Sequence, residues 1–164
     1  PLSTRSIDLL VSFGVSDPRE NTEAFLSYAE SGKLAKFNVV CIAPKRLSFT
    51  SHKPYIHVMK SGDDFPKLLA KSKRVLCNGG VTALEANFLG VEAIAIPSTN
   101  REDFFAYTLL EENVIRAIIS ANSLDSYFSN QLLGSSPHCQ KIIDGKGAER
   151  IVDHIWIAHN RYCK

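Results

Sequence analysis

The residues best suited to bind a ligand form a glycine-rich turn, N-G-G-V-T at positions 78–82. The turn follows a short apolar run and precedes a helical pattern. Two glycines let the backbone approach a ligand closely, because no Cβ stands in the way. A helix start also presents unpaired N–H groups and the positive end of the helix dipole. This combination suits a phosphate or diphosphate, although a tight turn between a strand and a helix selects glycine for steric reasons too.

Two common nucleotide-binding motifs are absent from the sequence. There is no G-x-x-x-x-G-K-[ST], so the turn is not the P-loop of a protein that binds nucleoside triphosphates. There is no full G-x-G-x-x-G either, which argues against a nicotinamide cofactor.

Thr82 and Glu85 allow two interpretations. The pattern T-x-x-E before an apolar run is typical of a capping box, in which the two side chains satisfy backbone N–H groups at a helix start. Alternatively, Glu85 accepts hydrogen bonds from ribose hydroxyls, as a carboxylate does in dinucleotide-binding folds. The local pattern alone favours the capping box.

A second glycine turn, G-V-S-D at positions 14–17, also precedes a helical pattern. Asp17 is a good N-cap, and Pro18 suits the first helical turn. An ordinary turn with an aspartate cap explains these residues. In a parallel sheet, however, the turn also points to the same edge as the glycine-rich turn.

The histidines and cysteines indicate no metal site. The five histidines lack metal-ligand spacing, and the four cysteines form no C-x-x-C pair. G-x-S-x-G is absent, and no Ser-His-Asp set can be argued. Cys41 and Cys77 lie in apolar runs, so we interpret them as small buried hydrophobic residues in a reducing compartment. We expect no bound metal ion.

Short apolar runs alternate with amphipathic segments along the whole chain. We expect strands at 7–13, 37–43, 55–59, 74–78, 91–96 and 115–119. We expect helices at 18–32, 64–72, 82–89, 101–112, 123–133 and 146–161. This order predicts one α/β domain over residues 1–164, with a six-stranded parallel sheet and helices on both faces, a Rossmann-like three-layer fold. Ligands of such sheets bind beyond the carboxyl ends of the strands, which selects the loops 14–18, 60–64, 78–82 and 97–102.

Composition excludes several classes of protein. The chain has 164 residues, of which 45% are hydrophobic and 22% charged, as in an ordinary globular domain. Nineteen basic and seventeen acidic residues give a net charge of +2, too weak a balance to indicate nucleic acid binding. No apolar stretch approaches the roughly 18 residues of a membrane span, and no signal peptide pattern opens the chain. We expect a cytoplasmic protein and, because the chain starts at Pro1, a processed form or an excised piece.

Three motifs in this order resemble a known family. They are S-F-G-V-S-D-P at 12–18, G-G-V-T-A-L-E at 79–85 followed by L-G-V at 89–91, and I-D-G-K-G-A-E-R-I at 143–151. They are similar to the second domain of the UDP-sugar hydrolases of pseudaminic-acid synthesis and the related spore-coat polysaccharide proteins. The second motif also resembles the nucleotide-sugar site of GT-B glycosyltransferases more broadly.

The resemblance implies a set of binding residues. In those families the diphosphate lies on the glycine-rich turn, a helix carboxylate binds the ribose, the loop after the third strand contacts the base, and the loop after the fifth strand contacts the sugar. The resemblance also places the glycine turn at positions 14–17 at the site. The matching residues here are Gly14, Ser16, Ser61, Gly62, Gly79, Gly80, Val81, Thr82, Glu85, Asn100, Glu102 and Asp103. The resemblance raises the ribose role of Glu85 above the cap. It implies a UDP-sugar as substrate, with no cofactor and no metal.

The resemblance covers only one half of a two-domain protein. It implies that the chain is the C-terminal, donor-binding half, and that the missing N-terminal domain carries the acceptor site and, in the hydrolases, the catalytic histidine. The fragment alone would then be inactive. The whole protein would be a glycosyltransferase or UDP-sugar hydrolase in the synthesis of surface polysaccharides or sialic-acid-like sugars.

The sequence departs from the family pattern at four positions. Val15 replaces a glycine, Glu92 replaces a proline at the start of a central strand, and Glu102-Asp103 replaces a sugar-binding glutamine. Carboxylates beside a sugar diphosphate alter sugar preference, repel the ligand or signal lost activity. The alternative function is therefore a non-catalytic, degenerate GT-B domain that serves as a binding or assembly module. A flavodoxin-like or receiver-like domain ranks lower, because the required acidic cluster is missing.

Overall fold

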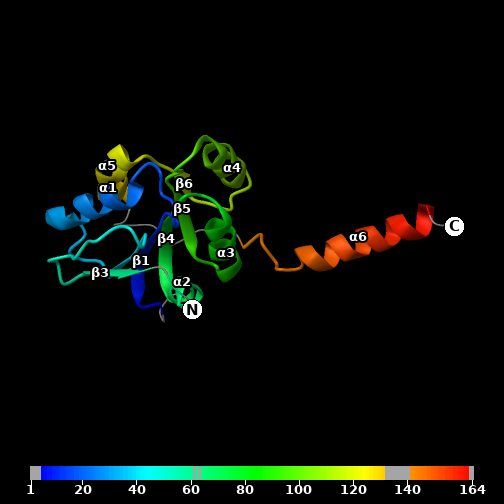
Figure 1. Cartoon of the computed structure of the whole chain (residues 1–164), viewed down its shortest axis with the longest axis horizontal. Helices are drawn as coiled ribbons and strands as arrows, with labels where there is room; N and C mark the ends of the chain where they lie inside the picture. The colour runs from blue at the N-terminus through cyan, green and yellow to red at the C-terminus, as the bar shows by residue number, and fades with distance from the viewer. Residues whose placement is uncertain (1–4, 61, 63, 132–140, 163–164) are drawn as a thin grey trace.

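Six parallel strands form one sheet in the order β3-β2-β1-β4-β5-β6 (Figure 1). The computed structural model describes residues 5–60, 62, 64–131 and 141–162. Each strand is a short apolar run, as expected where both faces of a sheet are covered. The strands are β1 (Ile7–Ser12), β2 (Val39–Ala43), β3 (Ile56–Lys60), β4 (Ser72–Cys77), β5 (Glu92–Ala95) and β6 (Ala117–Ile118).

Helices cover both faces of this sheet. They are α1 (Asn21–Tyr28) with a π-helical turn η2 (Ala29–Lys33), α2 (Phe65–Ala70), α3 (Val81–Leu89), α4 (Asn100–Glu111), the 3₁₀ turn η3 (Ala121–Ser123), α5 (Leu124–Gln131) and α6 (Gly147–Tyr162). Helices α2, α3 and α4 pack on one face through Leu69, Ala86 and Leu109. Helices α1 and α5 pack on the other face through Phe25 and Phe128. The predicted Rossmann-like three-layer fold is confirmed.

Alternate residues of each central strand belong to opposite cores. In β4, Val75 and Cys77 face the α2–α3–α4 side, while Leu76 faces the α1–α5 side. Successive side chains of a strand point to opposite faces of a sheet, so an uninterrupted apolar run supplies both cores at once. This packing holds the strands in place, and therefore also the loops that follow them at the carboxyl edge of the sheet.

The first helix begins later than the sequence predicted. Pro18 is not in its first turn, because α1 starts at Asn21. Asp17 and Glu20 both have positive φ, 33° and 55°. A helix requires negative φ, so the right-handed helix cannot start before Asn21. Asp17 still satisfies the helix start, since its carboxylate accepts hydrogen bonds from the backbone N–H groups of Asn21 and Thr22 at 3.1 and 2.8 Å.

Glu92, the unusual first residue of β5, has a partner on the neighbouring strand. Arg74 and Glu92 lie opposite each other in the β4–β5 ladder. The Arg74 Nε donates to Glu92 Oε1 at 2.8 Å, and only 3% of the glutamate side chain is exposed. The pair explains how a carboxylate occupies a position where the family pattern described above has proline.

Helix α6 extends away from the rest of the domain (Figure 1). The sequence predicted an amphipathic helix at 146–161, and the structure has it at Gly147–Tyr162. Its apolar side chains are nevertheless exposed, including 66% of Trp156. Helix α5 ends at Gln131 in the described part of the chain, so the last two positions of the predicted helix 123–133 lie outside the described residues.

Candidate functional site

The strand order places two glycine turns at the centre of the carboxyl edge. β1 and β4 are neighbours, and the order of the strands reverses between them. Open parallel sheets bind ligands in the crevice at this switch point. The loop after β1 carries Gly14 and Ser16, both exposed, and the loop after β4 carries Gly79 and Gly80. The structure therefore brings the two turns together, as the sequence predicted.

Gly79 is required by the packing of the protein itself. Its φ is +78°, and a Cβ added there would lie 2.9 Å from the Cβ of Ala106 and 3.1 Å from that of Ala95. Both values are too short for ordinary contact, and the left-handed conformation disfavours a side chain as well. Gly79 therefore holds the turn against α4, and its steric role does not by itself indicate a ligand.

The start of α3 has no side-chain cap. Gly80 is the N-cap residue of α3. It has no side chain that could accept a hydrogen bond from the N–H groups of the first turn, so the helix has no side-chain cap. The predicted capping box of Thr82 and Glu85 is therefore wrong, because the helix begins at Val81 and Thr82 already lies inside its first turn. The first N–H groups of a helix have no intrahelical acceptor, so Val81 and Thr82 are placed to donate to an anion in the crevice.

Asn78 connects the glycine-rich turn to the loop after β5. Its side-chain amide Nδ2 donates to Glu102 Oε1, and its Oδ1 accepts a 3.3 Å hydrogen bond from the Gly80 N–H. The other oxygen of Glu102, Oε2, accepts a 2.8 Å bond from the backbone N–H of Ser98. The backbone N–H of Glu102 donates in turn to Thr99 Oγ1, the N-cap of α4. Glu102 is thus a bridge between two loops.

Arg19 makes a second bridge, from the loop after β1 to the loop after β5 and the first turn of α4. Its guanidinium donates to the backbone O of Pro97 at 3.0 Å. It also donates to Asn100 Oδ1 at 3.0 Å and forms an ion pair with Asp103 at 3.0 Å. Asn100 and Asp103, which the resemblance assigns to sugar binding, therefore contact Arg19. Because this pair is about two-fifths exposed, water screens it and its contribution to stability is small.

A buried polar cluster lies beneath these bridges. Asn21 Nδ2 donates to Ser98 Oγ at 3.0 Å, and Ser98 Oγ donates to Asp17 Oδ1 at 3.4 Å. Thr22 Oγ1 donates to Asp17 Oδ2 at 2.6 Å. Buried polar groups are stable only when they are paired, and here the bonds link three elements to one another: the loop after β1, the start of α1 and the loop after β5. The cluster fixes the floor of the site.

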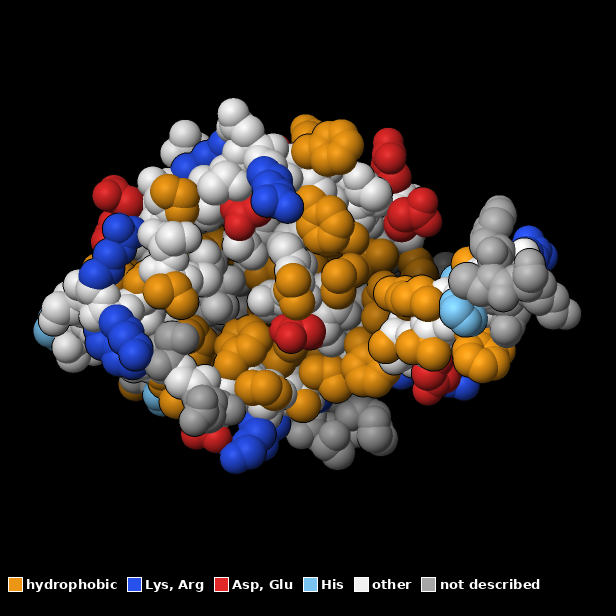
Figure 2. All heavy atoms as spheres, turned by 45° about the vertical axis from the view of Figure 1, so that its right-hand side comes forward, with side chains coloured by type: hydrophobic (Ala, Val, Ile, Leu, Met, Phe, Trp, Pro, Cys, Tyr) orange, Lys and Arg blue, Asp and Glu red, His pale blue; other side chains and the backbone are white. Residues whose placement is uncertain are grey.

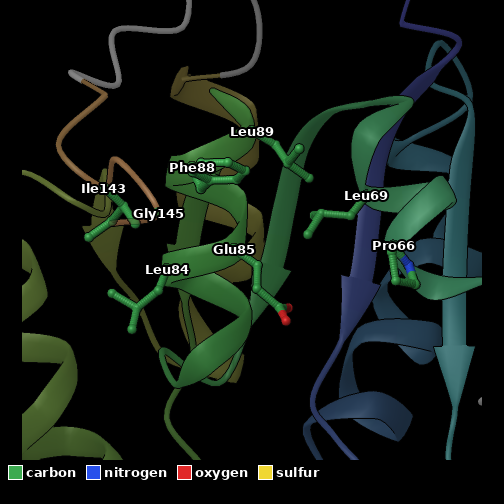
Figure 3. Close-up of a pocket in the computed structure, with 8 residues that line it drawn as sticks. All are labelled: Pro66, Leu69, Leu84, Glu85, Phe88, Leu89, Ile143 and Gly145. Atoms are coloured by element: carbon green, nitrogen blue, oxygen red, sulfur yellow. The ribbon is translucent and has the colours of Figure 1, made fainter. Parts of the chain in front are cut away.

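Glu85 lies apart from these bridges, on the side of α3 that faces α2. It lines a pocket of about 340 Å³ and is the one ionisable residue among the described residues of its wall (Figure 3). In the close-up its carboxylate extends from α3 toward the α2 side, below Phe88 and Leu89. The residues of the wall are Pro66, Leu69, Leu84, Glu85, Phe88, Leu89, Ile143 and Gly145.

The predicted base-contacting residues lie farther along the edge. Ser61 is outside the described residues. Gly62 is exposed and lines a hollow of about 80 Å³ with Met59, Asp64 and Phe65. It follows β3, which is two strands from β1 in the sheet. Helix α2 contributes to both this hollow and the Glu85 pocket, so it is the element that separates them.

The described residues form no metal-binding group, and the two cysteines among them are buried. No group of three or more His, Cys, Asp or Glu side chains among them could hold a metal ion. Burial raises the pKa of the Cys41 thiol to about 12 and that of Cys77 to about 11. Both cysteines are buried, as predicted, and such thiols are poor nucleophiles. No helix within the described ranges is long and apolar enough to cross a membrane.

The sequence placed Asn78 and Ser98 in candidate loops without giving either side chain a role, and it did not include Arg19. Asn78 lies between a strand and two glycines. A polar side chain at such a position can hydrogen-bond to the backbone of the turn and hold its conformation. Arg19 is the one cation in the loop between β1 and α1. The Ser98 side chain carried no usable signal, because the residues that its hydroxyl contacts are more than 75 residues away in the sequence.

No family model and no curated protein sequence matches this chain. Solved structures do match it. CalG4, the calicheamicin glycosyltransferase, matches with a TM-score of 0.70 and 19% identity over 98% of this chain and 44% of that one. A putative UDP-N-acetylglucosamine 2-epimerase from Listeria monocytogenes matches with a TM-score of 0.68 and 16% identity, covering 96% and 46%. The UDP-GlcNAc 2-epimerase of Methanocaldococcus jannaschii, in complex with UDP-GlcNAc and UDP, matches with a TM-score of 0.65 and 15% identity. The match covers 94% of this chain and 46% of that one.

These matches define the fold of the chain. It has the Rossmann-like fold that occurs in GT-B glycosyltransferases and UDP-GlcNAc 2-epimerases. The chain spans less than half the length of each of these three proteins. The narrower resemblance to the pseudaminic-acid and spore-coat group stays a prediction.

Proposed function

We propose that the chain binds a nucleotide sugar, a UDP-sugar, at the carboxyl edge of its sheet. The observation that carries this proposal is the uncapped start of α3 behind Gly79 and Gly80, at the switch point between β1 and β4. A helix start with free N–H groups and a nearby glycine turn is an anion site. The diphosphate would accept hydrogen bonds from the N–H groups of Val81 and Thr82, next to Gly80, whose own N–H donates to Asn78.

The other parts of the ligand have candidate positions on either side of the diphosphate. Glu85 is exposed one turn into α3, where its carboxylate can accept hydrogen bonds from ribose hydroxyls. The hollow at Gly62 and Phe65 is the candidate position for the base. Gly14 and Ser16 would line the opposite wall of the crevice. All of these roles rest on the diphosphate position.

The sugar would lie against the first turn of α4. Asn100, Glu102 and Asp103 are there, but each already bonds to Arg19, Asn78 or Ser98. A carboxylate oxygen accepts more than one hydrogen bond, so sugar hydroxyls can still donate to Glu102 and Asp103. The negative charge of both residues would disfavour an acidic sugar.

The chemical role of this half is to stabilise the departing diphosphate. Backbone N–H groups and a helix dipole that are already oriented stabilise developing charge without reorganisation. No metal ion and no cofactor are required for that role. We place the chain as the C-terminal, donor-binding half of a GT-B-type glycosyltransferase or UDP-sugar hydrolase of surface-polysaccharide or sialic-acid-like sugar synthesis. Its catalytic residues would belong to a separate N-terminal domain, so the chain alone would be inactive.

Calorimetric titration of UDP into the chain tests the proposal. We expect wild type to bind UDP, and Glu85→Ala to bind it about 10- to 100-fold more weakly, because a charged acceptor of hydrogen bonds contributes about 1.5–3 kcal/mol. Glu111→Ala is the matched control, since Glu111 is an exposed glutamate at the far end of α4. Absence of binding by wild type at millimolar UDP would refute the proposal.

A second candidate function is a non-catalytic binding or assembly module. The two bridges favour it, because Glu102 and Arg19 tie together the loops that would have to admit a sugar. Titration of UDP-N-acetylglucosamine beside UDP separates the two functions. If UDP-N-acetylglucosamine binds as tightly as UDP or more tightly, the nucleotide-sugar-binding function is favoured. If neither compound binds, the assembly module is favoured.

A further inference from the structure

The loop between β1 and α1 holds the backbone of Arg19 in a fixed place. Asp17 is 1% exposed, and its carboxylate accepts hydrogen bonds from the hydroxyls of Thr22 and Ser98, which join the loop to α1 and to the loop after β5. The backbone O of Asp17 accepts from the Glu20 N–H at 3.1 Å and closes a turn that contains Arg19. The base of the Arg19 side chain is therefore anchored at the switch point between β1 and β4.

The head group of Arg19, in contrast, lies at the surface. Its side chain is 43% exposed, and that of its ion-pair partner Asp103 is 39% exposed. The two side chains meet through two parallel contacts, Nη1 to Oδ1 at 3.4 Å and Nη2 to Oδ2 at 3.0 Å. Water screens such a pair, so separating it changes the free energy little. Arg19 thus combines a fixed base with a head group that is free to turn.

The start of α3 does not by itself balance the charge of a diphosphate. It supplies two N–H groups and the positive end of a helix dipole, which is equivalent to about half an elementary charge. A sugar diphosphate carries negative charge on each phosphate, and Glu102 and Asp103 in α4 add negative charge beside it. Figure 2 shows acidic and basic side chains next to one another at the top of the domain, the end at which α4 lies in Figure 1. A diphosphate site of this kind needs a positively charged side chain.

Arg19 lies where such a cation is needed. It contacts Asn100 and Asp103, the proposed sugar-binding residues, so its head group lies on the sugar side of the crevice. In a nucleotide sugar the sugar is attached to the β-phosphate, whereas the α-phosphate is attached to the ribose. Arg46, in the neighbouring loop after β2, is directed elsewhere, because it donates to the backbone O of Asp17 at 3.0 Å.

We propose that Arg19 binds the β-phosphate of the nucleotide sugar, and that its ion pair with Asp103 is the resting position of the side chain. This inference rests on the proposed nucleotide-sugar site. When the ligand binds, the guanidinium turns from the carboxylate to the phosphate, with which it also forms two parallel hydrogen bonds. The same turn frees Asn100 and Asp103 to accept hydrogen bonds from sugar hydroxyls. Binding of the diphosphate and opening of the sugar position are therefore one event.

Calorimetric titration of UDP and of UMP into the whole chain tests the contact with the β-phosphate. Arg19→Met should weaken UDP binding about 10- to 100-fold, the effect expected for the loss of a charged hydrogen-bond donor. UMP has no β-phosphate, so its affinity should stay within about twofold of the wild-type value. Retained UMP binding also shows that the variant is folded. Arg19→Lys keeps the charge but loses the planar pair of donors, so its UDP affinity should lie between those of wild type and Arg19→Met.

The matched control is Arg101→Met. Arg101 is an exposed arginine in the first turn of α4, and its side chain makes no hydrogen bond or ion pair with any other described residue. Because exposed charges are screened, this substitution should change UDP affinity by less than about threefold.

Asp103→Asn tests the resting position of Arg19. The substitution removes repulsion of the diphosphate in any background, but only a chain with Arg19 also gains from the released guanidinium. UDP binding should therefore strengthen about two- to fivefold more in the Arg19 protein than in the Arg19→Met protein. Equal strengthening in the two backgrounds would overturn the turn of the side chain.

The remaining outcomes separate this inference from the proposed function. If wild type binds UDP and Arg19→Met binds it as tightly, or loses UDP and UMP affinity by the same factor, the contact with the β-phosphate is overturned while the nucleotide-sugar site stands. If wild type binds no UDP, the proposed function is refuted and this inference with it.

Discussion

Glu102, in the first turn of α4, accepts a hydrogen bond from the side-chain amide of Asn78 at the end of β4. Its other carboxylate oxygen accepts from the backbone N–H of Ser98 at 2.8 Å. One carboxylate therefore joins the loops after β4 and β5. Because Asn78 also bonds to the Gly80 N–H, the negative charge of Glu102 lies one side chain away from the proposed diphosphate position.

Replacing Glu102 with glutamine should strengthen UDP binding. The substitution keeps the shape of the side chain and one of its two accepting oxygens. It removes a negative charge near the diphosphate, so repulsion falls. We expect the dissociation constant to decrease about three- to tenfold at low ionic strength, and by less at 0.5 M salt, where the charge is screened. Calorimetric titration at both salt concentrations measures the change.

The control for this substitution is Glu112→Gln. Glu112 is exposed at the opposite end of α4, so the same loss of charge should leave UDP affinity unchanged. Weaker binding by Glu102→Gln would show that the bridge to Asn78 matters more for the turn than the repulsion does.

Gly79→Ala should destabilise the fold far more than Gly32→Ala. Both glycines have positive φ, +78° and +91°, so both alanines incur about 1–2 kcal/mol of backbone strain. Only the Cβ at position 79 meets close atoms, those of Ala106 and Ala95, whereas nothing lies within 4 Å at position 32. Overpacking adds about 1–3 kcal/mol. Urea unfolding of the two variants measures the difference, and equal losses of stability would contradict the steric role of Gly79.

The order of the elements was predictable because each strand is an apolar run bounded by polar turns. β2 shows why: Val39–Ala43 is buried at every residue, so its whole sequence reads as one apolar segment. The glycine turns at the switch point followed from that order and from the rule for parallel sheets. Helix starts were harder, because the positive φ of Glu20 moves the start of α1 and has no marker in the residue types.

Contacts between distant loops could not be predicted. Glu102 was assigned to the sugar by resemblance, yet its partners Asn78 and Ser98 are set by how two loops meet in space. The partner of Glu92 depends in the same way on the register of β4 and β5, which places Arg74 opposite it. Pattern and propensity describe local structure, whereas these bonds depend on the register of the whole sheet.

Arg74 and Glu92 should show strong coupling in a double-mutant cycle. Arg74→Met leaves a carboxylate that is 3% exposed without its ion-pair partner, which typically costs about 3–5 kcal/mol. The double variant Arg74→Met/Glu92→Leu removes both charges, and its stability should return to within about 1 kcal/mol of wild type or exceed it. Chemical unfolding of the four proteins measures the coupling. Additive losses in the double variant would contradict the interpretation.

The free energy of unfolding should fall as the pH rises above about 9, through the buried thiols. Burial raises the pKa of Cys41 to about 12 and that of Cys77 to about 11, against an ordinary value of 9.0. Above pH 9 the unfolded chain releases these protons while the folded chain keeps them, so stability present below pH 9 is lost as the pH rises toward 11 and 12. Each thiol contributes a slope of up to ~1.4 kcal/mol per pH unit.

Urea unfolding at pH 8, 9 and 10 under reducing conditions measures the slope of the free energy of unfolding against pH, and the Cys41→Ala/Cys77→Ala variant should give a flatter slope. Tyr28 and Tyr127, whose phenol pKa values are also raised by burial, remain in both proteins, so the difference between the two slopes isolates the cysteines; identical slopes would refute the prediction.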